Sequence, residues 1–148
     1  MKTLIVAHPD DEILWFNPEE YDKIVIVFGD FGDHRAKEGG DRRRNALAKH
    51  PLKDKIVHLN IPESDFTRNK GNEGIYRLNQ RLIEEKLQEL EADEVTTHNG
   101  HGEYGHLEHI QVFYACMNAF DCPVNGKNPK IFRETKKIYE ECGAWTWY

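Results

Sequence analysis

The sequence is poor in cysteine and has no long apolar run. The three cysteines are Cys116, Cys122 and Cys142, and none belongs to a Cys-x-x-Cys pair. Since their number is odd, a framework of disulfide bonds is not expected, and we predict reduced thiols in a cytoplasmic protein. The apolar run after Met1 ends before His8, too early for a secretory leader or a membrane span, so no membrane association is expected.

Positive charge is also in the minority. The 148 residues include 20 Lys and Arg against 26 Asp and Glu, which gives a formal net charge of −6. Binding to nucleic acids and to anionic membranes depends on cationic surface, so neither partner is expected. A chain of this length can bury a core of its own, and we expect a single domain over residues 1–148.

Short runs of apolar or β-branched residues have the character of buried strands, and helical patterns separate them. The runs are Thr3–Ala7, Lys23–Phe28, Lys55–Asn60, Asp93–Thr97 and a shorter one at Lys130–Arg133. The helical patterns are Asp41–His50, Asn72–Ala92, Ile110–Phe120 and Thr135–Cys142. This alternation predicts an α/β fold, a Rossmann-like three-layer sandwich with a mostly parallel sheet. No Gly-x-Gly-x-x-Gly motif follows the first run, so no dinucleotide site is predicted.

The second helical pattern has its apolar residues at the 3.6-residue period, with Glu and Lys opposite them. Such a stripe is typical of a helix that packs one face against a sheet. The stripe that we expect to be buried consists of Ile75, Leu78, Leu82, Ile83, Leu87 and Leu90.

The first run leads into His8-Pro9-Asp10-Asp11-Glu12. An imidazole and two carboxylates this close offer nitrogen and oxygen ligands that suit a cation such as zinc. Asp10 and Asp11 are neighbours, so we expect one to hold the metal while the other faces its open coordination position. The alternative is that these acidic residues only stabilise the positive end of a following helix.

Four of the eight histidines lie between His98 and His109. His106 and His109 are three residues apart, so they would share one face of a helix behind a glycine-rich turn. They are predicted to be two ligands, or one ligand and a catalytic neighbour, with solvated surface histidines as the alternative. His98 ends the fourth run and is left open as a further ligand. Because parallel strands end at one edge of a sheet, this segment should meet His8 and the 29–34 segment there.

Both segments resemble motifs of the PIG-L/LmbE family of zinc-dependent N-deacetylases. The first is Ala-His-Pro-Asp-Asp-Glu at 7–12, and the second is Gly-Glu-Tyr-Gly-His-Leu-Glu-His at 102–109. The order of elements over most of the chain is also similar. The family commonly has His-Pro-Asp-His where this chain has Leu107 and Glu108 between the histidines. The chain is also short at its C-terminal end, a region that often shapes the substrate cleft of the family.

The resemblance implies a role for individual residues. His8, Asp11 and His109 would hold Zn²⁺ or another divalent transition metal, and Asp10 would be the general base. The cofactor is therefore expected to be zinc or a related ion.

The same resemblance implies the residues around the substrate. His106 would stabilise the oxyanion or act as an acid, with Glu108 as its orienting partner. Arg43 would contact the substrate. Tyr104 would close the pocket beside the metal, where we assign it to substrate binding, or would pack the loop.

The predicted function is removal of an N-acetyl group from an amino sugar or an amino-sugar conjugate by metal-activated water. The alternatives are a metal-dependent hydrolase of another bond, such as a phosphoester, and a metal-binding module without catalysis. The aromatic residues Trp145, Trp147 and Tyr148 would pack on the domain, or they would form a subunit contact or a sugar-stacking surface. A subunit contact would give a homo-oligomer.

Overall fold

The computed structural model describes residues 1–30, 36–120, 138–139 and 141–142. Its strands form one four-stranded sheet in which each neighbouring pair is parallel. In sheet order the strands are β3 (Ile56–Pro62), β2 (Lys23–Asp30), β1 (Lys2–Val6) and β4 (Glu94–Thr97).

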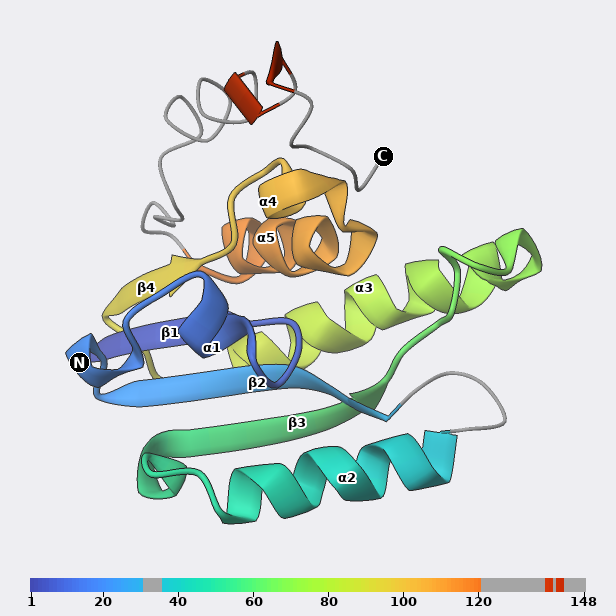
Figure 1. Ribbon diagram of the computed structural model, residues 1–148. Helices are drawn as coiled ribbons and strands as arrows, with labels where there is room; N and C mark the ends of the chain where they lie inside the picture. The colour runs from blue at the N-terminus through green and yellow to red at the C-terminus, as the bar shows by residue number, and fades with distance from the viewer. Residues whose placement is uncertain (31–35, 121–137, 140, 143–148) are drawn as a thin grey trace.

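Helices cover both faces of the sheet, which confirms the predicted Rossmann-like α/β sandwich (Figure 1). The α-helices are α1 (Asp11–Leu14), α2 (Ala36–Ala48), α3 (Glu73–Gln88), α4 (Gly102–Gly105) and α5 (Leu107–Ala119). Short 3₁₀ turns are η1 (Pro18–Glu20), η2 (Lys53–Lys55) and η3 (Lys70–Asn72). Helix α2 lies on one side of the sheet, and α3 and α5 lie on the other.

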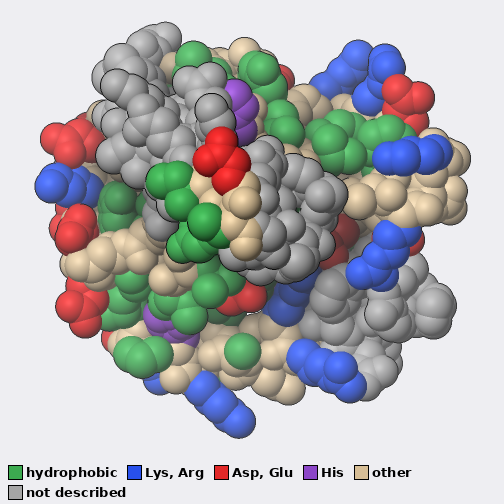
Figure 2. Space-filling model, turned by 45° about the horizontal axis from the view of Figure 1, so that its top comes forward, with side chains coloured by type: hydrophobic (Ala, Val, Ile, Leu, Met, Phe, Trp, Pro, Cys, Tyr) green, Lys and Arg blue, Asp and Glu red, His purple; other side chains and the backbone are tan. Residues whose placement is uncertain are grey.

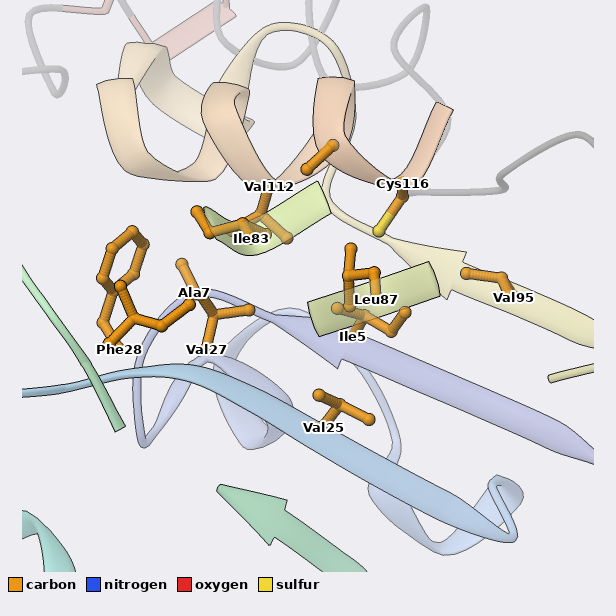
Figure 3. Packing of buried hydrophobic residues seen from close by; sticks show 12 residues of the cluster. Ile5, Ala7, Val25, Val27, Phe28, Ile83, Leu87, Val95, Val112 and Cys116 are labelled. Atoms are coloured by element: carbon orange, nitrogen blue, oxygen red, sulfur yellow. The ribbon is translucent and has the colours of Figure 1, made fainter. Parts of the chain in front are cut away.

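Alternate side chains of β1 and β2 enter two separate apolar layers. The layer against α3 and α5 includes Ile5, Val25, Val27, Ile83, Leu87, Val112 and Cys116 (Figure 3). The layer against α2 includes Leu4, Val6, Ile24, Ile26 and Leu47. Both central strands are therefore buried on both faces, which is why they appear in the sequence as continuous apolar runs. Each side chain of this size contributes about 1.5–3 kcal/mol when fully buried.

The elements predicted within the described residues are present, but several of their ends differ. Strand β2 continues to Asp30 and β3 to Pro62, each two residues further than predicted. Helix α2 begins at Ala36, before the predicted Asp41. The predicted strand Lys130–Arg133 and half of the predicted helix Thr135–Cys142 lie outside the described residues, as do the aromatic residues Trp145, Trp147 and Tyr148.

The start of α5 also differs, and the difference has a specific cause. This helix begins at Leu107, because the Nδ1 atom of His106 accepts the backbone N–H of Glu108 at 3.2 Å and caps the helix. The prediction that His106 and His109 share a helix face is therefore wrong, since His106 precedes the first turn.

The expected apolar stripe of α3 is only partly buried. Ile83 and Leu87 are fully buried, but Ile75, Leu78 and Leu82 are 49%, 64% and 37% exposed. The buried face instead continues through Asn79, whose Nδ2 donates to the carbonyl oxygen of Pro62 at 2.8 Å. A buried amide that ties the helix to the end of β3 thus occupies a place where the period alone predicts an apolar residue.

The sheet has its topological switch point between β1 and β4. Strand β1 pairs with β2 on one side and with β4 on the other. In open parallel sheets of this kind, ligands bind in the crevice at the carboxyl ends of the two strands that flank this point. The two histidine-bearing segments of the sequence follow these same two strands, so the fold brings them to one crevice.

The described surface carries both signs of charge. On the face in Figure 2, acidic, basic and hydrophobic side chains all appear around the edge. Among the described residues, no helix combines the length and the apolar character needed to cross a membrane.

The burial of Cys116 predicts that the two described thiols differ in reactivity. Cys116 is fully buried, and burial raises the pKa of its thiol to about 12, whereas Cys142 is exposed. At pH 8 an alkylating reagent should modify Cys142 in the native protein and reach Cys116 only after denaturation, because Cys116 is both shielded and protonated. Peptide mapping by mass spectrometry measures this, and equal native labelling of the two cysteines would contradict the described core.

Candidate metal centre

The turn after β1 separates the two neighbouring aspartates. Asp10 has φ 98° and ψ −27°, and its backbone N–H donates to Glu12 Oε2 at 2.9 Å. Asp11 folds back on the strand end, where its Oδ2 accepts the backbone N–H of His8 at 2.8 Å. Asp11 is consequently buried while Asp10 is exposed, so the two carboxylates have different surroundings, as neighbours in a tight turn should.

The turn after β4 depends on backbone conformations that few residues adopt. Gly102 has φ 61°, and a Cβ at this position would lie 2.9 Å from Cγ1 of Ile110. Glu103 follows with φ 63° and is fully buried. This turn brings the Glu103 carboxylate against the rings of His98 and His109.

The two turns meet at one carboxylate oxygen. Asp11 Oδ2 lies 3.2 Å from Nδ1 of His8 and 3.2 Å from Nε2 of His109. With metal–ligand bonds of about 2.0–2.1 Å, ligand atoms at two corners of a tetrahedron are about 3.3–3.4 Å apart. The structure thus places Asp11 beside both His8 and His109, the other two residues expected to hold a metal, and each of these two separations fits a zinc-sized ion.

The second ring nitrogen of both His8 and His109 faces a carboxylate. His109 Nδ1 lies 2.8 Å from Glu103 Oε2. His8 Nε2 lies 2.9 Å from Glu63 Oε1 and 3.0 Å from Glu108 Oε1. Histidine ligands of metals usually donate their other ring N–H to such a group, which fixes the tautomer and leaves the first nitrogen free to bind. Among the described residues, three groups have ligand atoms within 4.8 Å of one another and are positioned to hold a metal ion: His8 with His106 and His109, Asp11 with His98 and His109, and His8 with Glu63 and Glu108.

His98 lies beside this centre, but its ring is hydrogen-bonded to the backbone at the end of β1. Its Nε2 accepts the N–H of Ala7 at 2.9 Å, and its Nδ1 donates to Glu103 Oε2 at 3.0 Å. Burial lowers the pKa of His98, so the ring is neutral and its only acceptor nitrogen is already used. His98, which the sequence allowed as a further ligand, thus connects the end of β1 to the turn after β4.

His106 is a neutral donor. Its Nδ1 accepts the Glu108 N–H, which places the ring proton on Nε2. Burial and the neighbouring His109 and His8 lower the pKa of His106 to about 3. Its ring stacks on His109 at 4.5 Å between centroids. Of the two roles expected for His106, this geometry favours the oxyanion donor over the acid.

The pKa values follow from these contacts. Burial acts to lower the pKa of His8, but hydrogen bonds to Asp11, Glu108 and Glu63 raise it well above the usual value. Burial would raise the pKa of Asp11, yet the hydrogen bonds from His109 and His8 hold it well below its usual range. The imidazoles and carboxylates thus stabilise each other's charged forms.

The pKa values of the surrounding carboxyl groups are shifted in opposite directions. Despite burial, hydrogen bonds from His109 and His98 lower the pKa of Glu103 to about 2. The pKa of Glu63 is also lowered to about 2 against burial, by His8 and by Arg43. Burial raises the pKa of Glu108. Burial and the charge of Asp11 raise the pKa of Asp10.

A cavity of about 380 Å³ opens over the centre. Its volume is at the lower end of the range for small-molecule sites, roughly 300–1,000 Å³. Asp10 and His106 line it, as do Arg43 and Tyr104, the residues expected to contact a substrate. Further aromatic side chains in the lining are Trp15, Phe66 and Tyr76.

The structure places three carboxylates differently from the sequence analysis. The Glu108 carboxylate contacts His8, and only the backbone N–H of Glu108 contacts His106. Glu63 and Glu103 were not among the expected site residues. Glu63 directly follows β3, and its position after a strand end is the signal that could have identified it. Glu103 stands in the histidine-rich segment, but nothing in the pattern shows that this one carboxylate turns inward.

The segment after β2 was also expected at this edge. Its Gly29 and Asp30 end the strand, and the remainder, 31–34, lies outside the described residues. Comparison with models of known protein families and with curated proteins finds no match to this chain.

The left-handed backbone of Asp10 predicts how substitutions at this position change the free energy of unfolding. A residue other than glycine at this φ carries strain of about 1–3 kcal/mol, and glycine does not. Asp10→Gly should therefore have a free energy of unfolding about 1 kcal/mol higher than that of Asp10→Ala, since both lose the carboxylate. At the exposed helical Glu85 the order should reverse, because alanine favours a helix interior. Denaturant unfolding measures all four variants, and an Asp10→Ala protein as stable as Asp10→Gly would contradict the strained turn.

Metal binding should release protons. In the metal-free protein the pKa values of His8 and His109 are raised, so at pH 7 these rings hold protons that a cation must displace. Zinc affinity should therefore rise with pH and fall as the pH drops, with about one to two protons released near pH 7. Calorimetric titration in two buffers of different ionisation enthalpy measures the release. A binding enthalpy that is the same in both buffers would show that the rings are already deprotonated.

Proposed function

We propose that this chain is a metal-dependent amide hydrolase that removes an N-acetyl group from an amino sugar or an amino-sugar conjugate. His8, Asp11 and His109 would hold zinc or another divalent transition metal. The observation that carries the proposal is the convergence of these three groups at Asp11 Oδ2, below a cavity that Asp10 and His106 also line.

The donor set supports this kind of chemistry. Two imidazole nitrogens and one carboxylate leave room for water in a tetrahedral site, as catalytic zinc sites do. A divalent cation bound there supplies Lewis-acid polarisation of the amide carbonyl and lowers the pKa of bound water.

Asp10 and His106 would carry the proton and the developing charge. Asp10 is exposed at the cavity and its raised pKa suits a group that takes a proton from water and passes it to the leaving amine. The Nε2–H of the neutral His106 would donate to the oxyanion as it forms at the carbonyl. Arg43 and Tyr104 would bind the substrate, and the aromatic side chains Trp15, Phe66 and Tyr76 offer faces for a sugar ring.

The alternatives have less support. A phosphoester would bring negative charge to a cavity whose lining holds more carboxylates than arginines: Asp10, Asp11, Glu63, Asp65 and Glu108 against Arg43 and Arg68. A metal-binding module without catalysis would not need Asp10 or the His106 donor over the centre. The cytoplasmic location and a homo-oligomer stay predictions from the sequence.

Metal analysis and acetate release test the proposal together. The purified protein should contain about one divalent metal ion per chain and release acetate from at least one member of a panel of N-acetylated amino sugars. His8→Ala and His109→Ala should lose the metal. Asp10→Asn should keep it and lose roughly 10²–10⁴-fold in turnover, because only the proton acceptor is removed.

A matched control is His101→Ala, which removes an exposed histidine of the same segment and should keep metal and turnover. Turnover that survives in Asp10→Asn would exclude Asp10 as the base. Release of phosphate from phosphoesters, without release of acetate from any amide, would replace the proposed reaction with the alternative one.

A further inference from the structure

Glu12 is a buried carboxylate that the proposed reaction does not use. It is 2% exposed and follows the ligand Asp11 in the chain. Its oxygens are divided between two partners: Oε2 accepts the backbone N–H of Asp10 at 2.9 Å, and Oε1 lies 3.1 Å from Nε2 of His50.

His50 comes from a different part of the fold, two residues after the end of α2. Its Nδ1 accepts the backbone N–H of Leu52 at 2.9 Å, so the proton of the neutral ring is on Nε2 and is directed at Glu12. A continuous series of hydrogen bonds therefore runs from the backbone after α2, through His50 and Glu12, to the backbone of Asp10.

Asp10 needs such support because of its backbone conformation. A φ of 98° is unfavourable for an aspartate and persists only where several contacts fix it. The carbonyl oxygen of Asp10 accepts the N–H groups of Ile13 and Leu14 at 3.1 and 3.0 Å. The Asp10 N–H, in turn, is held by Glu12. Both peptide groups of the residue are thus fixed, and with them the direction of its Cα–Cβ bond.

We propose that Glu12 and His50 are positioning residues that hold Asp10 in the orientation of a base. The proposal rests on the function proposed above for Asp10. Among the described residues, the hydrogen bonds of these two side chains go to Asp10, to each other and to Leu52, and not to His8 or His109. Their loss should therefore displace the base and leave the metal ligands in place. The end of α2 would thereby set the geometry at the end of β1.

Three variants test the series. Glu12→Gln has one amide oxygen for two donors, Asp10 N–H and His50 Nε2–H, so one hydrogen bond must break. His50→Leu removes the donor to Glu12. His50→Gln restores it, because the glutamine amide can accept from Leu52 and donate to Glu12 as the imidazole does. Matched controls are Glu19→Gln and His101→Gln, which change exposed residues of the same types.

The first measurement needs no substrate. Amide hydrogen exchange followed by NMR should show a protected Asp10 N–H in the wild-type protein. In Glu12→Gln and His50→Leu that amide should exchange at least about tenfold faster, because local opening becomes easier. His50→Gln and both controls should stay near the wild type. Zinc affinity should change by less than about threefold in every variant, against its loss in His8→Ala.

The second measurement is turnover. Glu12→Gln and His50→Leu should lower kcat roughly 10- to 100-fold with KM changed by less than about threefold, since a displaced base affects the reaction and not substrate binding. His50→Gln should recover most of the kcat.

Unchanged Asp10 exchange in both disruptive variants would overturn the proposal, as would zinc affinity that falls as far as in His8→Ala. If the wild-type protein hydrolyses no amide, the proposed function fails. The exchange and zinc data would then still decide whether Glu12 and His50 position Asp10.

Discussion

The centre depends on one carboxylate oxygen that joins two distant parts of the chain. Asp11 Oδ2 accepts the backbone N–H of His8 and lies 3.2 Å from a ring nitrogen of both His8 and His109. Without this oxygen the two imidazoles would face each other in a buried place with no opposite charge between them. Removing one member of such a buried set is costly because the remaining charge loses its partner.

Around this oxygen, glutamates hold the groups that the chemistry would use. Glu103 fixes His98 and His109, Glu63 and Glu108 face His8, and Glu12 holds the backbone of Asp10. Each carboxylate is paired with an imidazole or a backbone N–H, as burial of charge requires. The same carboxylates raise the pKa values of His8 and His109, because in the metal-free protein protons on these rings balance the negative charge.

The sequence predicts the sheet well and the outer parts of the site poorly, for physical reasons. Strands buried on both faces appear as unbroken apolar runs, so β1 and β2 could be found, and the order of elements then places His8 and His109 at one edge. In contrast, the burial of Glu103 depends on left-handed backbone at 102 and 103, and the place of Glu63 depends on where β3 ends. Periodicity alone also fails at two positions. His106 caps a helix instead of lying within it, and Asn79 is a buried polar residue where an apolar one is expected. In both cases a hydrogen bond to the backbone outweighs the helical period.

His98 connects strand pairing with the centre. Its ring receives the N–H of Ala7, a residue 91 positions earlier in the chain, and shares the Glu103 oxygen with His109. Slippage of β4 by one residue against β1 would reverse the side of the sheet on which each β4 side chain lies and would break this link. The candidate ligands His8 and His109 therefore come together only after these two strands have found their register. An ion added to the refolding chain should stabilise the finished topology rather than guide the early steps, since its ligands lie far apart until that pairing has formed.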